Sequence, residues 1–318
     1  MRSLKWAVGL VVLAVIGLAT LYWTPDTDKA LMRKKYGSPT SQYVDLGGGL
    51  TVHLRDEGPR GAPVIVLLHG SNSSLQTWDS WTSALTGRFR VIRFDAPGHG
   101  LTGDYPARDY SRAAFADIVS RVTTRLGVAR FVLVGNSMGG GVAWAYAHDH
   151  PERLTGLVLV DAAGEPEPMD ASPPLGFRLA RMPVVRDLMT YITPRSLIAD
   201  GLRQSVSNQK VVTPAVIDRY WELLRYPGNR QATIDRFATP REQPVAAPLS
   251  RHIPTLIMWG AEDKLIPVRS AAWFKVNVPD AQVVIYPKVG HLMMEEIPSR
   301  SSGDLAVWLG KLAPTNTD

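Results

Sequence analysis

The sequence predicts an α/β fold in which helices cover both faces of a mostly parallel sheet. Short apolar runs of strand length recur along most of the chain, and helical stretches such as residues 113–126 and 138–148 separate them. Most of these runs are apolar throughout instead of alternating with polar residues, which is typical of strands that are buried on both faces.

Eight segments have the character of strands. Residues 42–46 and 50–54 flank Gly47-Gly48-Gly49, and this pattern predicts a hairpin. A third helical stretch, residues 301–311, closes the predicted fold. The other six predicted strands are residues 63–68, 90–95, 131–134, 157–160, 255–259 and 282–286.

Between the sixth and seventh predicted strands, the alternation of strands and helices is interrupted. Residues 164–248 are rich in proline and contain amphipathic helical pieces at 177–190 and 214–224, which predicts a helical cap. The aromatic residues of this segment argue against a disordered insert. The predicted domain division is an anchor or signal segment at 1–24, a linker at 25–40, core at 41–163, the cap at 164–248 and core at 249–318.

The composition excludes several classes of protein. The 318-residue chain is 45% hydrophobic and 20% charged, as a globular protein is. It has no cysteine, so disulfides, thiolate catalysis and cysteine metal sites are ruled out. The net charge of +6 is spread along the chain apart from Arg33-Lys34-Lys35, so no nucleic-acid partner is expected.

The N-terminus predicts a membrane anchor. No charged residue occurs between Trp6 and Trp23, and as a helix this run would be about 27 Å long. Aromatic residues stand near both ends, as in membrane-spanning helices. A cleaved signal peptide is the alternative, whereas a buried core helix does not suit a run that is apolar on every face.

The basic residues that flank this run give opposing signals for its orientation. Arg2 and Lys5 precede it, and Lys29 and Arg33-Lys34-Lys35 follow it. We predict a single-pass, membrane-anchored protein whose catalytic domain lies outside the cytoplasm.

The segment Gly135-Asn136-Ser137-Met138-Gly139 predicts a nucleophile. It joins the strand at 131–134 to the helix at 138–148, which is the context of a G-x-S-x-G nucleophile elbow. The sharp turn needs small neighbours, and it exposes the serine hydroxyl at the positive end of the helix dipole. The alternative is a glycine-rich turn with an incidental serine.

A second segment, His69-Gly70-Ser71-Asn72, follows the strand at 63–68. A backbone N–H in this loop, which we assign to Ser71, can pair with that of Met138 to form an oxyanion hole. An ordinary turn is the alternative.

The base and the acid come from the last two predicted strands. His291 is the only one of the seven histidines in a loop after the last strand, and imidazole changes protonation near neutral pH. Asp263 follows the strand at 255–259 and can orient the base. Glu262 and Asp161 are alternative acids.

Together these motifs resemble the α/β-hydrolase superfamily from residue 42 onward. Two further segments add to the resemblance, namely Asp95-Ala96-Pro97-Gly98-His99-Gly100 and Gly290-His291 followed by Glu295. The resemblance implies a mostly parallel eight-stranded sheet with a helical cap and a Ser137–His291–Asp263 triad.

The elbow is similar to that of carbon–carbon bond hydrolases of ring-cleavage products. Those enzymes usually carry a tryptophan after the histidine and a glycine-rich oxyanion loop, whereas this chain has Leu292 and Ser71-Asn72-Ser73-Ser74. We therefore expect a carboxylesterase-like enzyme that cleaves a small-molecule ester or thioester without metal or cofactor. A carbon–carbon hydrolase and a non-catalytic receptor are the alternatives. Candidates for the pocket lining are Trp78, Trp81, Met138 and Trp221.

Overall fold

The eight predicted strands form one sheet in the order β1-β2-β4-β3-β5-β6-β7-β8. The computed structural model describes residues 6, 17, 22–165, 173–183, 185–238, 245 and 247–312. Strand β2 pairs antiparallel with β1 on one side and with β4 on the other. All other neighbouring strands are parallel. The strands are β1 (Ser41–Asp45), β2 (Thr51–Glu57), β3 (Val64–Leu68), β4 (Arg90–Phe94), β5 (Phe131–Asn136), β6 (Leu154–Val160), β7 (Thr255–Gly260) and β8 (Gln282–Tyr286).

The central strands are apolar because both of their faces are covered. In β3, Ile65 and Leu67 pack into one hydrophobic cluster, while Val66 and Leu68 pack into the other. Successive side chains of a strand point to opposite faces, so a strand between two cores has no polar face. The edge strands β1 and β8 are more exposed.

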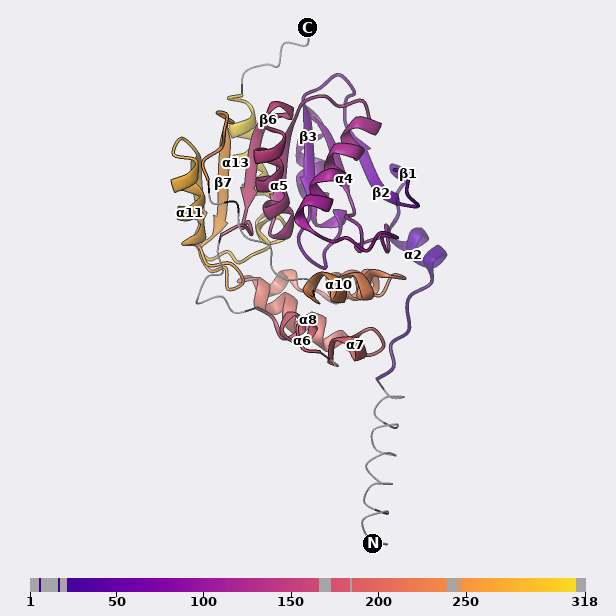
Figure 1. Cartoon of the computed structure of the whole chain (residues 1–318). Coiled ribbons are helices and arrows are strands. Elements are labelled where there is room, and N and C mark those ends of the chain that lie inside the picture. The colour runs from indigo at the N-terminus through magenta and orange to yellow at the C-terminus, as the bar shows by residue number, and fades with distance from the viewer. Residues whose placement is uncertain are drawn as a thin grey trace.

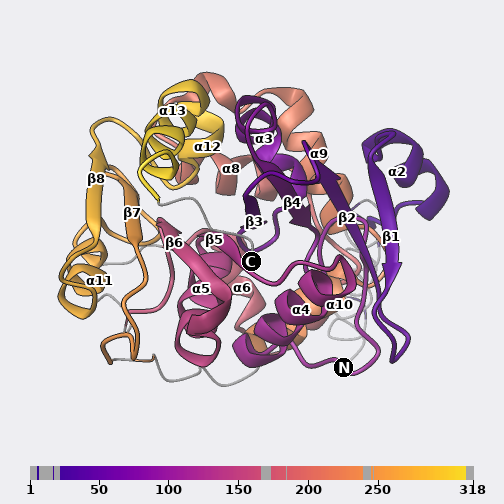
Figure 2. The ribbon, with the colours of Figure 1, turned by 90° about the horizontal axis from the view of Figure 1, so that it is seen from above.

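Helices cover the two faces of the sheet in two layers (Figures 1 and 2). The three helices that the sequence predicts for the core are confirmed as α4, α5 and α13. One face carries α4 (Arg112–Arg125), α5 (Met138–Asp149) and α11 (Ser270–Asn277), and the other carries α3 (Asp79–Leu85), α12 (Met293–Glu296) and α13 (Pro298–Leu309). Short 3-10 turns occupy Leu75–Trp78, Pro151–Arg153 and Gln209–Val211.

The helices described between β6 and β7 lie at one end of the sheet (Figure 1). The helix expected over 177–190 is instead two shorter helices with Pro183 between them, because proline interrupts the helical hydrogen bonds. The cap helices are α6 (Leu175–Ala180), α7 (Val185–Met189), α8 (Arg195–Ser205), α9 (Pro214–Leu224) and α10 (Asn229–Ala238).

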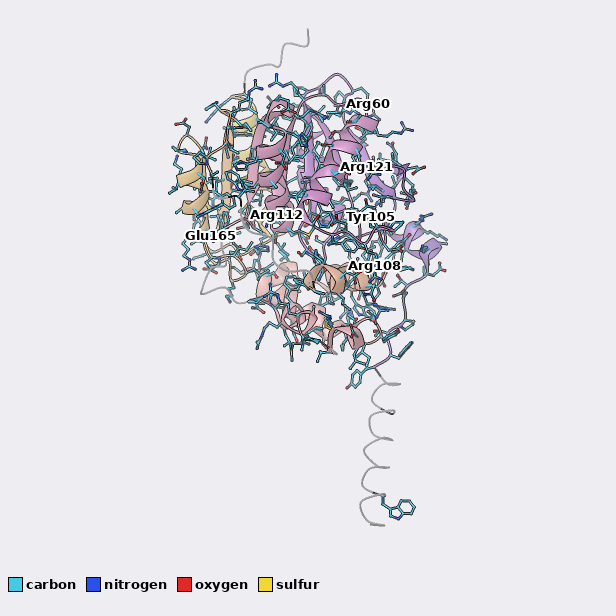
Figure 3. The ribbon with its side chains drawn as sticks, in the orientation of Figure 1. Arg60, Tyr105, Arg108, Arg112, Arg121 and Glu165 are labelled. Atoms are coloured by element: carbon cyan, nitrogen blue, oxygen red, sulfur yellow. The ribbon has the colours of Figure 1, made fainter. Side chains whose placement is uncertain are left out.

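Helix α10 joins the cap to the core. Arg108, labelled in Figure 3, lies beside this helix, and its guanidinium donates to both carboxylate oxygens of Asp235 at 2.8 and 2.6 Å. The amide of Asn229 donates to the carbonyl of Gly100 at 3.0 Å, and Asn229 is buried. These contacts fix α10 relative to the sheet.

The segment expected to be a linker contains a helix, α2 (Lys29–Tyr36). The Asp28 side chain accepts a hydrogen bond from the N–H of Leu31 at 2.7 Å, which caps the helix. Met32 is buried in a small cluster with Leu101, Leu223 and Tyr226, so α2 packs on the boundary of core and cap.

The prediction of a membrane-spanning helix is wrong for the part of the chain that the structure describes. No helix there is long and apolar enough to cross a bilayer, which needs about 20 apolar residues. The first complete helix, α2, has eight residues and four basic side chains. Most of the apolar run at 6–23 lies outside the described residues. The fold class is therefore corrected to the capped sheet alone, and the predicted single-pass anchoring and extracytoplasmic location lose their basis.

Candidate active site

Ser137 lies in a strained turn between β5 and α5. Its φ of 55° and ψ of −118° place a residue with a side chain in the left-handed region. The backbone of Ser137 is held on both sides, since its N–H donates to Val160 and its carbonyl accepts from Gly141 and Ala163. The geometry is that of a nucleophile elbow.

The small residues beside Ser137 are required by close backbone contacts. A Cβ on Gly135 would lie 2.2 Å from the carbonyl oxygen of Gly139, and a Cβ on Gly139 would lie 2.4 Å from that of Leu68. No side chain fits at such distances. The glycines therefore allow α5 to begin directly against β3 and β5.

His291 and Asp263 are in direct contact. Nδ1 of His291 lies 2.6 Å from Oδ2 of Asp263, and both side chains are buried. The other carboxylate oxygen of Asp263 accepts from the N–H groups of Leu265 and Ile266 at 2.8 and 3.1 Å. Both oxygens of Asp263 are therefore hydrogen-bonded, which fixes the orientation of the carboxylate toward His291.

The two alternative acids lie differently. Glu262 is exposed. Asp161 is fully buried, and its Oδ1 accepts from the N–H of Gly260 at 2.8 Å, while its Oδ2 has no partner in the described part of the chain. Burial, followed by the negative charge of Asp263, raises the pKa of Asp161 well above its usual range. A carboxyl group whose pKa is raised is a poor partner for a histidine cation.

Asp161, Asp263 and His291 also form the one described cluster with the residue types of a metal site, and their ligand atoms lie within 4.8 Å of one another. The 2.6 Å contact between Asp263 and His291 is a hydrogen-bond distance. Two ligand atoms that each lie about 2.0–2.2 Å from one tetrahedral zinc ion are farther from one another than Nδ1 of His291 is from Oδ2 of Asp263. The cluster therefore suits proton chemistry better than metal binding.

Ser137 and His291 line the same cavity, which has a volume of about 120 Å³. Its floor is formed by core residues at the ends of β3 and β5, and its roof is formed by the cap. Most of the roof is apolar and includes Phe177, Leu197 and Ile234. The cavity brings an apolar ligand against a hydroxyl and an imidazole.

The predicted oxyanion loop lies against the elbow. A Cβ on Gly70 would be 3.1 Å from the Cβ of Ser137, so the loop backbone passes directly beside the serine. Ser71 lines the cavity, and Met138 is the first residue of α5, where backbone N–H groups lack partners within the helix. Both predicted donors are therefore near Ser137.

The predicted pocket lining is wrong. Trp78 and Trp81 are fully buried between the sheet and α13, and Trp81 donates to Ser301 at 2.9 Å. Trp221 donates to the carbonyl of Thr193, and Met138 faces a second, smaller pocket. None of the four lines the main cavity, where Phe177 and Tyr220 supply the aromatic rings.

Sequence reasoning missed the groups that hold the histidine loop. The N–H of His291 donates to the carbonyl of Ser205 in α8 at 2.8 Å. One carboxylate oxygen of Glu296 accepts from Gly290 at 2.8 Å, and the other accepts from Ser207 and Asn208, each at 2.9 Å. The cap thus contacts the backbone of the loop that carries His291.

A second, partly buried network joins cap and core next to the cavity. Oε1 of Glu295 accepts from Thr77, Arg219 and Tyr220, each at 2.8 Å. Burial, followed by the charge of Glu295, raises the pKa of the Tyr220 hydroxyl. In the sequence, only its place after His291 distinguishes Glu295.

A family model described as "alpha/beta hydrolase fold" matches residues 63–298. This chain belongs to the α/β-hydrolase family. A relative from Mycobacterium bovis, which has no assigned activity, is 31% identical over 252 residues, covering 75% of this chain and 72% of its own. The family membership confirms the resemblance that the motifs indicated.

Two other α/β hydrolases carry names that specify an activity. The 2-hydroxymuconate semialdehyde hydrolase of Pseudomonas sp. is 28% identical over 276 residues, covering 85% of this chain and 94% of its own. The crystal structure of a membrane phospholipase A, described as a bacterial virulence factor, matches with a TM-score of 0.72 and 25% identity over 98% of this chain and 99% of its own. The first name specifies a semialdehyde substrate, whereas the second specifies a phospholipid substrate.

Proposed function

We propose that this α/β hydrolase cleaves a carboxylic ester or thioester through a Ser137–His291–Asp263 triad. The proposal rests on one observation. His291, which is hydrogen-bonded to the buried Asp263 at 2.6 Å, lines the same apolar cavity as Ser137 on its strained turn. A nucleophile, a base and a residue that orients the base are the three parts that acyl transfer needs.

The mechanism follows from these positions. Ser137 Oγ attacks the acyl carbon while its proton moves to Nε2 of His291, and the carbonyl π electrons move onto the oxygen. The N–H groups of Ser71 and Met138 stabilise this oxyanion. The intermediate then collapses, and the alcohol or thiol leaves with the proton from His291. Water attacks the acyl-enzyme by the same route, which releases the acid and restores Ser137.

The apolar roof of the cavity supports an ester with a hydrocarbon acyl or alcohol part. The similarity to a phospholipase, whose substrate is an ester, agrees with this choice. Leu292 and the serine-rich oxyanion loop, where carbon–carbon hydrolases usually have tryptophan and glycines, also favour ester cleavage.

Carbon–carbon cleavage is the second candidate, and one observation favours it. The 28% identical relative is named for a semialdehyde substrate instead of an ester. A non-catalytic receptor on the same fold is the third candidate, and the presence of all three proposed catalytic residues argues against it.

The deciding experiment uses the full chain and its Ser137→Ala variant. We expect the protein to cleave p-nitrophenyl esters of short or medium acyl length, and we expect the variant to lose this activity. Turnover of a ring-fission dienoate with no p-nitrophenyl ester cleavage would select the carbon–carbon hydrolase. A folded protein that turns over neither and does not react with a fluorophosphonate would select the receptor.

A further inference from the structure

Arg236, on the cap helix α10, contacts both segments of the predicted oxyanion hole. Its Nη1 donates to Oγ of Ser71 and lies 3.1 Å from the sulfur of Met138. Its Nη2 donates to Oδ1 of Asn72 at 3.4 Å. The guanidinium therefore bridges the loop after β3 and the start of α5.

The charge of Arg236 has no ionic partner among the described residues. None of their carboxylates lies within ion-pair distance of the guanidinium, and its Nε is buried without a hydrogen bond. Burial lowers the pKa of Arg236 to about 10, so the side chain stays charged at neutral pH. An unpaired buried cation is unfavourable for stability, which points to a role in which a negative charge forms nearby.

The surrounding contacts hold this cation in place. Asp235, the preceding residue, pairs with Arg108 of the core. Thr233, one turn earlier on α10, donates to Oδ1 of Asn72 at 2.9 Å. Helix α10 is thus fixed to the oxyanion loop by neighbours of Arg236 as well as by Arg236 itself.

We propose that Arg236 is a positioning residue that fixes the oxyanion loop and adds positive charge beside the oxyanion as it forms. The inference rests on the proposed acyl transfer at Ser137. The effect belongs to the transition state, because the ester carbonyl is neutral in the ground state and the oxygen becomes negative only on attack. The cap would then supply part of the catalytic electrostatics in addition to the walls of the cavity.

The test compares Arg236→Met, Arg236→Gln and Arg236→Lys with a matched control, Arg203→Met. Arg203 is on α8 of the same cap, is exposed and pairs only with Asp200 among the described residues. We expect the Met and Gln variants to lower kcat for p-nitrophenyl butyrate by roughly tenfold or more with little change in KM. The Lys variant, which keeps the charge, should lie between them and the wild type.

A second measurement, inhibition by a boronic acid, tests how well the site stabilises a tetrahedral anion on Ser137. Phenylboronic acid is neutral in solution and becomes a tetrahedral anion when it bonds to a serine hydroxyl. Its inhibition constant should rise in parallel with the loss of kcat. A general loosening of the cap would instead raise KM, and Arg203→Met should change neither value.

The outcomes separate the two proposals. An inactive wild type whose Ser137 is not labelled by a fluorophosphonate overturns the acyl-transfer mechanism, and the inference fails with it. An active wild type whose folded Met or Gln variant keeps wild-type kcat and boronate inhibition overturns the role of Arg236 alone. If the Met variant does not fold, the Gln variant is judged by the same criterion.

Discussion

Oγ of Ser41 lies 2.8 Å from Nε2 of His53, and this pair belongs to a second Ser-His-Asp row. Nδ1 of His53 lies 2.7 Å from Oδ2 of the buried Asp95. The order of groups is that of the proposed catalytic triad. Ser41, however, lies on an edge strand, lines neither described pocket, and its Oγ accepts from the N–H of Ser38 at 3.1 Å. The row is expected to be structural.

A fluorophosphonate should therefore label Ser137 and leave Ser41 unmodified. Ser137 has a cavity, a strained turn and nearby backbone donors, whereas Ser41 has only the side-chain row. Mass spectrometry of the labelled protein identifies the site. Ser137→Ala should abolish labelling and Ser41→Ala should retain it. A label on Ser41 in folded protein would contradict the assignment.

Asp263→Asn is expected to lower kcat for p-nitrophenyl esters by about 10³–10⁴-fold. The amide cannot accept Nδ1–H in the way a carboxylate does, and it does not stabilise the histidine cation. Steady-state kinetics measure the loss. The matched control is Glu262→Gln, which changes the exposed neighbouring acid and should leave kcat within about twofold. Equal effects of the two substitutions would show that Asp263 is not the orienting acid.

Asp161→Asn is expected to stabilise the protein increasingly as pH rises. The folded-state pKa of Asp161 is raised, so the folded protein binds its proton more tightly than the unfolded chain does. Wild-type stability then falls as pH rises above about 4, where the unfolded carboxyl ionises. Asparagine retains the acceptor for Gly260 and carries no charge.

Urea unfolding at pH 5 and pH 8 measures this difference. The stability gain of Asp161→Asn should be larger at pH 8 than at pH 5. Asp187→Asn is the control, because the side chain of Asp187 is 73% exposed. A gain that is the same at both values of pH would mean that Asp161 is ionised in the folded protein.

Glu296→Gln should destabilise the protein by about 1–3 kcal/mol and also lower kcat. Glu296 accepts from Gly290, Ser207 and Asn208 through two oxygens, and the glutamine NH₂ would face a donor at one of these positions. Because Gly290 precedes the proposed base, the histidine loop should loosen. Thermal unfolding and steady-state kinetics on the same sample report the two effects, and an unchanged melting temperature would refute the first.

Gly139→Ala should abolish folding or lower the melting temperature sharply, because the new Cβ would lie 2.4 Å from a backbone carbonyl of β3. Gly303→Ala is the matched control. A Cβ there meets nothing within 4 Å, and alanine in the interior of α13 should stabilise the helix by about 0.5–1 kcal/mol. Similar melting temperatures for the two variants would show that the elbow tolerates a side chain.

The sheet and the elbow could be predicted because their signals are local. A strand covered on both faces is apolar along its whole length, as β3 is. The turn at Ser137 requires small neighbours within two residues. His291 and Asp263 were predicted from their places after β8 and β7, and the structure brings them into contact.

The contacts between cap and core could not be predicted in this way. Arg236 meets Ser71 across 165 positions of sequence, and Glu296 meets Ser207 across 89. No periodicity or motif encodes such pairs, since they depend on how the cap packs on the sheet. The tryptophans at 78 and 81 were misplaced for the same reason, because the 3-10 turn Leu75–Trp78 and α3 are oriented so that both rings lie in the core.

The hydrogen bond from His291 N–H to Ser205 has a consequence for protein engineering. Here a cap helix supplies the acceptor that holds the backbone of the proposed base, at 2.8 Å. A transplanted cap would have to present a carbonyl at the same point, so chimeras designed only for the shape of the cavity should bind ligands better than they turn them over.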